Sequence, residues 1–177
     1  MPNAACVDVY KVLSAAGAPF GLVDYGSFAM NVLRMEKAFK GAGELTNEVT
    51  LPEADVMRFM NSEKHYLGKV ETLAGADNLR WICAYLEIEP DGQIDGHGGE
   101  AVLCDGAVVG STASVVFSPT VNKILAFAYI KPQAAQAGTQ LEVIIAGEPR
   151  SAVVRAEPVY DPQSLRPRSD AKTEAVA

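Results

Sequence analysis

The sequence has few of the residues that build metal sites and disulfides. It holds two histidines and three cysteines in 177 residues. Cys6, Cys83 and Cys104 form no pair at metal-ligand spacing and leave one cysteine over for any disulfide pairing. His65 and His97 share no nearby acidic or thiol partner at ligand spacing. We therefore expect buried thiols, a reducing compartment and no metal site.

Long apolar runs and an excess of positive charge are also absent. Runs such as Ala113–Phe117 and Ile124–Ile130 are too short to cross a bilayer. The formal net charge is −7, which disfavours attraction to nucleic acid or to an anionic membrane surface. The first residues show neither a basic flank nor an apolar stretch before a cleavage site. We expect no export and a cytoplasmic setting.

The composition itself is that of a packed globular domain. Hydrophobic residues make up 49% and charged residues 21%, close to the averages of soluble proteins. Apolar residues recur at helical spacing over residues 4–16, 25–39 and 66–73. The sequence therefore predicts three helices in its first half, within one domain or one domain and a small lobe.

From Arg80 onward the pattern changes to short runs of Val, Ile and aromatic residues separated by Gly, Asp and Pro. This pattern is typical of strands joined by tight turns. The predicted strands are Trp81–Glu87, Ala101–Leu103, Ala107–Val116, Ile124–Ile130, Leu141–Ile145 and Ser151–Ala156. Six strands at this spacing predict a small antiparallel barrel or sandwich, so the fold class is α+β.

One face of the second predicted helix is polar. Ser27, Asn31 and Arg34 fall at positions i, i+4 and i+7, which stacks their side chains. The Arg34 guanidinium can bind a ligand carboxylate with two parallel hydrogen bonds. The alternative is that Arg34 binds backbone carbonyls or an acidic partner such as Glu36 or Glu53 and only fixes the helix.

Other candidates carry weaker signals. Tyr25 can stack or hydrogen-bond at a cavity mouth, although a tyrosine at a helix start is usually packing. Glu36 and Lys37 could contact a ligand, and the alternative is that they lie on the helix surface or anchor a loop. The glycine-rich segment around His97 has no following helix and no lysine, so it predicts a turn rather than a phosphate site.

Several segments together resemble the aminomethyltransferases, the T-proteins of glycine cleavage. The stretch Tyr25–Lys37 is similar to the family pattern Gly-x-x-Ala-x-x-x-Leu-Arg-Leu-Glu, and its Leu-Arg-Met-Glu-Lys form resembles the fused dimethylglycine and sarcosine dehydrogenases. Further similar segments follow in family order over residues 6–162: Leu45–Ala54, Tyr66–Lys69, Gly98–Gly110, Pro119–Ile130 and Ala156–Pro162.

The resemblance implies a helical remnant of the folate-binding domain over residues 1–78, an antiparallel β-barrel over 79–161 and a disordered tail over 162–177. In the family, tetrahydrofolate lies in a cavity lined largely by an amino-terminal half, which also supplies an aspartate near the reactive nitrogen. That half would precede Met1, so we expect no catalytic residue in this chain. The resemblance makes Arg34, Asn31, Tyr25 and Glu36 the candidate cofactor-binding residues.

Two functions follow as hypotheses. In the first, the chain completes a tetrahydrofolate-dependent aminomethyl- or methyl-transfer enzyme by adding one wall of the cavity, and tetrahydrofolate binds only with the missing half. In the second, the chain is a non-catalytic lobe or small subunit that docks on a separate catalytic chain. The partner would be the amino-terminal folate-binding half or a flavoprotein chain, with oligomerisation possible. No dinucleotide fingerprint follows a strand, so we expect no FAD site here.

Overall fold

The computed structural model describes residues 2–61, 63–90 and 96–168. One compact unit ends at Met30, and the other begins at Asn31. The first unit contains α1 (Cys6–Gly17) flanked by the 3-10 turns η1 (Asn3–Ala5) and η2 (Ala18–Phe20). This is the first predicted helix, and none of its residues is buried.

Helix α2 (Ser27–Glu36) starts later and ends earlier than the predicted range of 25–39. Its end is set by Ala38, which adopts a left-handed conformation with φ of 52°. The Ala38 N–H then donates to the carbonyl of Met35 over 2.9 Å, and the Phe39 N–H donates to that of Arg34 over 2.8 Å. These two bonds form a Schellman motif, which satisfies the last carbonyls and turns the chain away.

The polypeptide between α2 and the first strand contains two more short helices. They are η3 (Met57–Phe59) and α3 (Lys69–Gly75). The third predicted helix, over 66–73, therefore begins three residues later, at Lys69, and ends two residues later, at Gly75. Gly68 precedes α3 with φ of 83°, a conformation that glycine adopts without strain.

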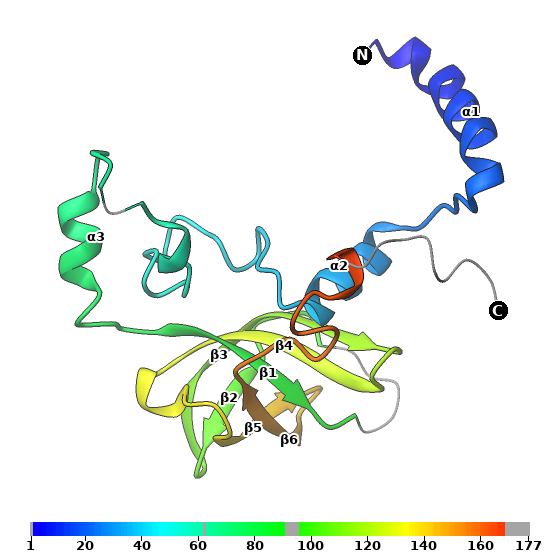
Figure 1. Cartoon of the computed structure of the whole chain (residues 1–177). Coiled ribbons are helices and arrows are strands. Elements are labelled where there is room, and N and C mark those ends of the chain that lie inside the picture. The colour runs from blue at the N-terminus through cyan, green and yellow to red at the C-terminus, as the bar shows by residue number, and fades with distance from the viewer. Residues whose placement is uncertain (1, 62, 91–95, 169–177) are drawn as a thin grey trace. The chain divides into compact units, whose positions relative to one another are not determined.

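Six antiparallel strands form a closed barrel in the order β1-β4-β3-β2-β5-β6 (Figure 1). The predicted barrel is confirmed, and closure excludes the sandwich. Short 3-10 turns η4 (Pro132–Ala134) and η5 (Arg166–Arg168) lie between β4 and β5 and after β6. The strands are β1 (Ile82–Ile88), β2 (Ala101–Cys104), β3 (Ala107–Ser118), β4 (Lys123–Ile130), β5 (Gln140–Ile145) and β6 (Glu148–Arg155).

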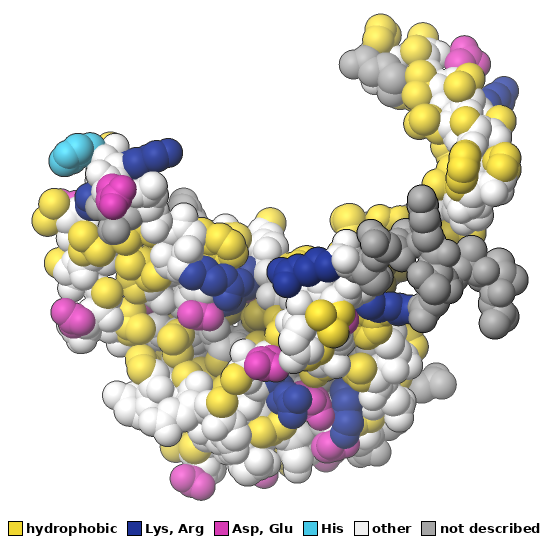
Figure 2. Space-filling view, viewed as in Figure 1, with side chains coloured by type: hydrophobic (Ala, Val, Ile, Leu, Met, Phe, Trp, Pro, Cys, Tyr) yellow, Lys and Arg dark blue, Asp and Glu magenta, His cyan; other side chains and the backbone are white. Residues whose placement is uncertain are grey.

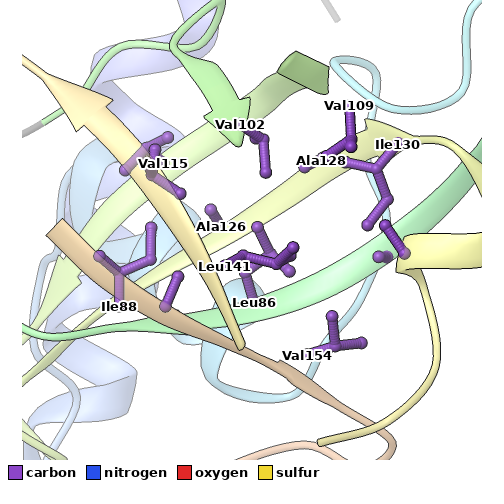
Figure 3. Packing of buried hydrophobic residues seen from close by; sticks show 14 of the residues in the cluster. Leu86, Ile88, Val102, Val109, Val115, Ala126, Ala128, Ile130, Leu141 and Val154 are labelled. Carbon is purple, nitrogen blue, oxygen red and sulfur yellow. The ribbon is translucent and has the colours of Figure 1, made fainter. Parts of the chain in front are cut away.

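Alternate residues of each strand fill the barrel. Figure 3 shows these side chains converging from different strands, with Leu86 and Ile88 from β1 and Ala126 and Ala128 from β4. Small alanines sit next to larger Leu, Ile and Val side chains, which allows the strands to close tightly. Because successive side chains of a strand point to opposite faces, the intervening residues form a second apolar surface outside the barrel.

That outer surface receives the end of α2. Met35 is completely buried there against Cys83, Tyr85, Leu125 and Phe127. The Tyr85 hydroxyl donates to the Met35 carbonyl over 2.8 Å, and the Tyr85 and Phe127 rings lie 5.3 Å apart. The end of α2 is therefore fixed to the barrel by both packing and hydrogen bonding.

The segment after β6 returns to the same place. The N–H of Tyr160 donates to the carbonyl of Glu36, and the Lys37 ammonium donates to the carbonyl of Asp161 and to the Ser164 hydroxyl. Of the predicted tail over 162–177, residues 162–168 are described, and the rest lies outside the described residues. Within the described residues, no helix has the length and apolar character needed to span a membrane.

Candidate ligand-binding site

Arg34 lies at the centre of a polar cluster between α2 and the barrel. Its Nε donates to the Oδ1 atom of Asn31 over 2.7 Å. One Nη1 bond goes to the Phe39 carbonyl over 3.0 Å and another to Oε2 of Glu44 over 2.9 Å. Nη2 donates to the Ser114 hydroxyl over 3.1 Å. Within the described residues, four of the five guanidinium N–H donors are thus engaged, which leaves one at Nη2 for a ligand.

Glycines around the loop allow this close approach. A Cβ on Gly41 would lie 3.3 Å from the Arg34 guanidinium carbon, and a Cβ on Gly43 would lie 2.8 Å from the Ser114 Oγ. Ser114 itself sits where the β3–β4 register shifts between Thr112 and Ser114. The bulge re-aims this side chain toward the cluster, as bulges commonly do beside functional residues.

Glu44 is the acidic partner of Arg34, in place of the anticipated Glu36 or Glu53. Its side chain is fully buried, whereas that of Arg34 is 22% exposed. Oε2 also accepts the Gly41 N–H over 2.6 Å, while Oε1 has no hydrogen-bond partner among the described residues. Burying a carboxylate costs free energy unless a cation or hydrogen-bond donors compensate its charge. The Arg34 guanidinium supplies that charge, so Glu44 holds it in place.

Glu36 points into the protein instead of toward this cluster. It is buried, and its Oε1 accepts the Ser118 hydroxyl over 2.6 Å. Tyr25, in the first unit, has a side chain that is exposed to solvent. The structure therefore brings two of the four candidate cofactor-binding residues, Asn31 and Arg34, into direct contact.

A groove beside the end of α2 has a volume of about 540 Å³, which is in the range of small-molecule sites. Four cationic residues line it, among them Arg58 and Arg155, together with Asp55 and Glu157. Three of the cations are already paired: Lys37 with Asp161, Lys40 with Asp55, and Arg155 with Glu87. We call it the basic groove.

The Cys83 thiol lines this groove and Tyr129 is paired with Cys83 on the neighbouring strand, and neither group is acidic. Burial raises the pKa of Cys83 to about 12, so this thiol stays protonated and is a poor nucleophile at neutral pH. Burial and the neighbouring Cys83 raise the pKa of Tyr129. The Tyr129 hydroxyl donates to the Glu44 carbonyl over 2.6 Å, which gives it a role in positioning the loop.

Glu53 and Arg80 hold the segment that follows. Arg80 donates through Nε to Oε1 of Glu53 over 2.7 Å and through Nη2 to Oε2 over 3.0 Å. These bonds, opposed by burial and assisted by Thr50, lower the pKa of Glu53 to about 2. The Glu53 carbonyl accepts the Cys83 N–H over 2.7 Å, so the pair fixes this segment to the start of β1.

The turn at His97 is closed by a carboxylate. The N–H groups of His97 and Gly98 donate to Glu100, and so does the Thr112 hydroxyl. Burial opposes ionisation of Glu100, but these hydrogen bonds outweigh it and lower the pKa. Glu100 therefore occupies the His97 and Gly98 N–H groups with a carboxylate of the chain itself. Among residues 2–61, 63–90 and 96–168, no three His, Cys, Asp or Glu side chains gather to hold a metal.

Comparisons with known sequences identify the barrel. Residues 83–161 match the sequence model of the glycine cleavage T-protein C-terminal barrel domain. The barrel belongs to the T-protein family. The match begins at Cys83, one residue into β1, and ends at Asp161 in the segment that returns after β6.

Relatives of this T-protein barrel extend the similarity to the helices. Human mitochondrial dimethylglycine dehydrogenase is 34% identical over 172 residues, 94% of this chain and 20% of that protein. An aminomethyltransferase of Thermoanaerobacter pseudethanolicus is 31% identical over 164 residues, 90% of this chain and 44% of that protein. The chain thus spans a fifth to under half of the curated relatives that it matches.

A solved structure has the same T-protein fold. The glycine cleavage system aminomethyltransferase T of Bartonella henselae superimposes with a TM-score of 0.68 at 18% identity, over 76% of this chain and 38% of that one. The expected family membership and the α+β barrel fold are both confirmed.

The alternative that Arg34 binds a backbone carbonyl is borne out at Phe39, but sequence reasoning missed two of its side-chain partners, Glu44 and Ser114. Glu44 follows two glycines that leave room for the guanidinium, and an acidic residue among small residues is a usable signal. Ser114 gave no such signal, since it depends on a strand bulge that only barrel closure defines. The role of Arg34, Asn31, Tyr25 and Glu36 toward a cofactor stays a prediction.

Proposed function

We propose that this chain forms one wall of a tetrahydrofolate cavity in an enzyme that transfers an aminomethyl or methyl group. The family membership supports the reaction class. The observation that carries the proposal is the rigid placement of the Arg34 guanidinium by Asn31, Glu44 and Ser114. When bound, tetrahydrofolate would accept the one-carbon unit.

Arg34 can bind a folate carboxylate through one hydrogen bond but not through two. Arg34 keeps one N–H at Nη2 and partial exposure, so it can give a carboxylate oxygen one charge-assisted hydrogen bond. A two-bond fork would require breaking the contact with Ser114 or another present partner. The chain would therefore orient the ligand from one side and exclude water there.

The remaining walls would come from the rest of a T-protein-like protein. The relatives are longer than this chain, and one wall alone buries too little of a folate for tight binding. We propose that the partner is an amino-terminal folate-binding half or a flavoprotein chain. The cytoplasmic setting is part of the same proposal.

Calorimetric titration with tetrahydrofolate tests this function. The chain alone should show weak binding or none, whereas a mixture with the candidate partner should bind. Arg34→Lys keeps the charge but loses the planar fork and should weaken that binding, while Lys64→Gln on the exposed surface should not. Micromolar binding by the chain alone would contradict the incomplete cavity, and silence in the mixture would contradict the folate function.

A second function is a non-catalytic lobe that docks on a catalytic chain. The observation that favours it lies within the first unit, where α1 and its flanks expose large apolar side chains. They include Val7, Val12, Leu13, Phe20, Leu22 and Val23. Exposed apolar sets of this size mark interaction surfaces. Complex formation without folate binding in the same mixture would support this function.

A further inference from the structure

An apolar hollow lies next to the basic groove in the second unit. Its volume is about 500 Å³, in the range of small-molecule sites. It shares Ala38, Phe39, Lys40 and Arg58 with the basic groove. The apolar side chains lining it are Phe39, Leu45, Leu51, Val56, Phe59 and Met60.

Four of these apolar side chains, Phe39, Leu45, Leu51 and Phe59, are exposed although they gather in one concave place. Phe59 is 73% exposed and Phe39 is 59% exposed. Figure 2 shows basic side chains next to hydrophobic ones on the visible face of this unit. Leaving such a group in water is costly, and concave apolar groups of this kind are typical of ligand sites.

The walls of the hollow are held by the backbone. The Val56 N–H donates to the Leu51 carbonyl over 3.2 Å, and the Met60 N–H donates to the Met57 carbonyl over 3.0 Å. The segment between them is tied to β1 through the Glu53 carbonyl. A ligand would therefore meet a largely preformed surface, which lowers the entropic cost of binding.

Two cations lie at the edge of the hollow. The Arg58 guanidinium carbon sits 4.7 Å from the centroid of the Phe59 ring, which places a charge beside an aromatic surface. Lys40 is paired with Asp55, whereas no carboxylate within the described part of the chain forms an ion pair with Arg58. No acidic side chain of the described residues lines the hollow.

We propose that this hollow binds a small organic anion with a flat apolar body. The body would lie against Phe39, Phe59 and Leu51, and the carboxylate would accept hydrogen bonds from Arg58. The Arg58 guanidinium beside the Phe59 ring, with no ion-pair partner among the described residues, favours an anion over a neutral ligand. This site is separate from Arg34 and does not depend on the proposed folate function.

The test uses 2-naphthoate and its neutral analogue 2-naphthamide on the full chain. Methyl NMR of the five methionines reports the location, because Met60 lines the hollow while Met30 and Met35 do not. Naphthoate should shift the Met60 signal and bind roughly tenfold more tightly than naphthamide, the gain of one charge-assisted hydrogen bond.

Variants separate the charge from the apolar surface. Arg58→Gln should bring the two affinities to within about twofold, since the charged donor is lost. Phe59→Ala should weaken both ligands, and the exposed control Lys64→Gln should change neither. Equal affinities for the two ligands in the unmodified chain, or naphthoate binding that leaves Met60 unshifted, would overturn the proposal.

Discussion

The Nη1 atom of Arg34 lies 2.9 Å from Oε2 of Glu44, whose side chain is fully buried. Glu44 precedes the barrel in sequence, and its backbone carbonyl accepts the Tyr129 hydroxyl from β4. The ion pair and this hydrogen bond together join α2, the loop after it and the barrel. The polar cluster around Arg34 therefore stabilises the fold, and it is also a candidate ligand contact.

Removing the Arg34 charge should destabilise the second unit. Arg34→Met would leave the Glu44 carboxylate buried without its cation, at a cost of roughly 3 kcal/mol in the free energy of unfolding. Urea denaturation followed by circular dichroism measures it. The exposed Arg168→Met is the matched control and should cost under about 0.5 kcal/mol. Equal stabilities of the two variants would show that the pair contributes nothing.

The Glu53–Arg80 pair should make stability depend on pH in acid. The pKa of Glu53 is lowered from 4.5 to about 2 in the folded chain, so ionised Glu53 favours folding. This contribution is complete above the unfolded pKa near 4.5 and is lost as the pH falls toward 2. In Glu53→Gln the denaturation midpoint should depend less on pH between these values. The substitution should lower the free energy of unfolding by roughly 1–3 kcal/mol at neutral pH.

Glu63→Gln provides the comparison for this pH profile. Glu63 is exposed, and its substitution should leave the acid dependence as it is. If the unmodified chain and Glu53→Gln lose stability in parallel between pH 4.5 and pH 2, another carboxylate carries the effect.

Gly110 should tolerate no side chain. A Cβ there would lie 2.0 Å from the Tyr129 carbonyl oxygen on the neighbouring strand, and backbone atoms of a closed barrel cannot move aside. Gly110→Ala should lower the free energy of unfolding by roughly 3 kcal/mol or more. Gly75→Ala meets nothing within 4 Å and should be neutral or slightly stabilising. Thermal melting measures both variants. Equal melting temperatures would contradict the prediction that the barrel has no room for a side chain at Gly110.

The three cysteines should react in a fixed order. Cys6 is exposed to solvent, Cys104 is partly exposed and Cys83 is buried. Burial raises the pKa of Cys83 to about 12. Iodoacetamide at pH 8 should label Cys6 first and Cys83 only after unfolding. Peptide mass spectrometry over time follows each site. Early labelling of Cys83 in the folded chain would mean that the start of β1 opens readily.

Much of the barrel was predictable because its signals are local. The apolar run of β-branched and aromatic residues in Ile124–Ile130 indicates a strand, and the Asp105-Gly106 turn joins β2 to β3. The sequence did not decide between a closed barrel and a sandwich, because that choice depends on strand pairings such as β2 with β5. No local pattern encodes a pairing between strands so far apart in sequence.

The candidate site divides in the same way. The sequence by itself determined the polar face of α2, because Asn31 and Arg34 stand at helical spacing whatever they contact. Only the tertiary structure decided that Arg34 pairs with Glu44 and Ser114 while Glu36 turns inward to Ser118. Helical periodicity fixes which side chains share a face, but their partners come from segments that meet only when the barrel closes and α2 packs on it.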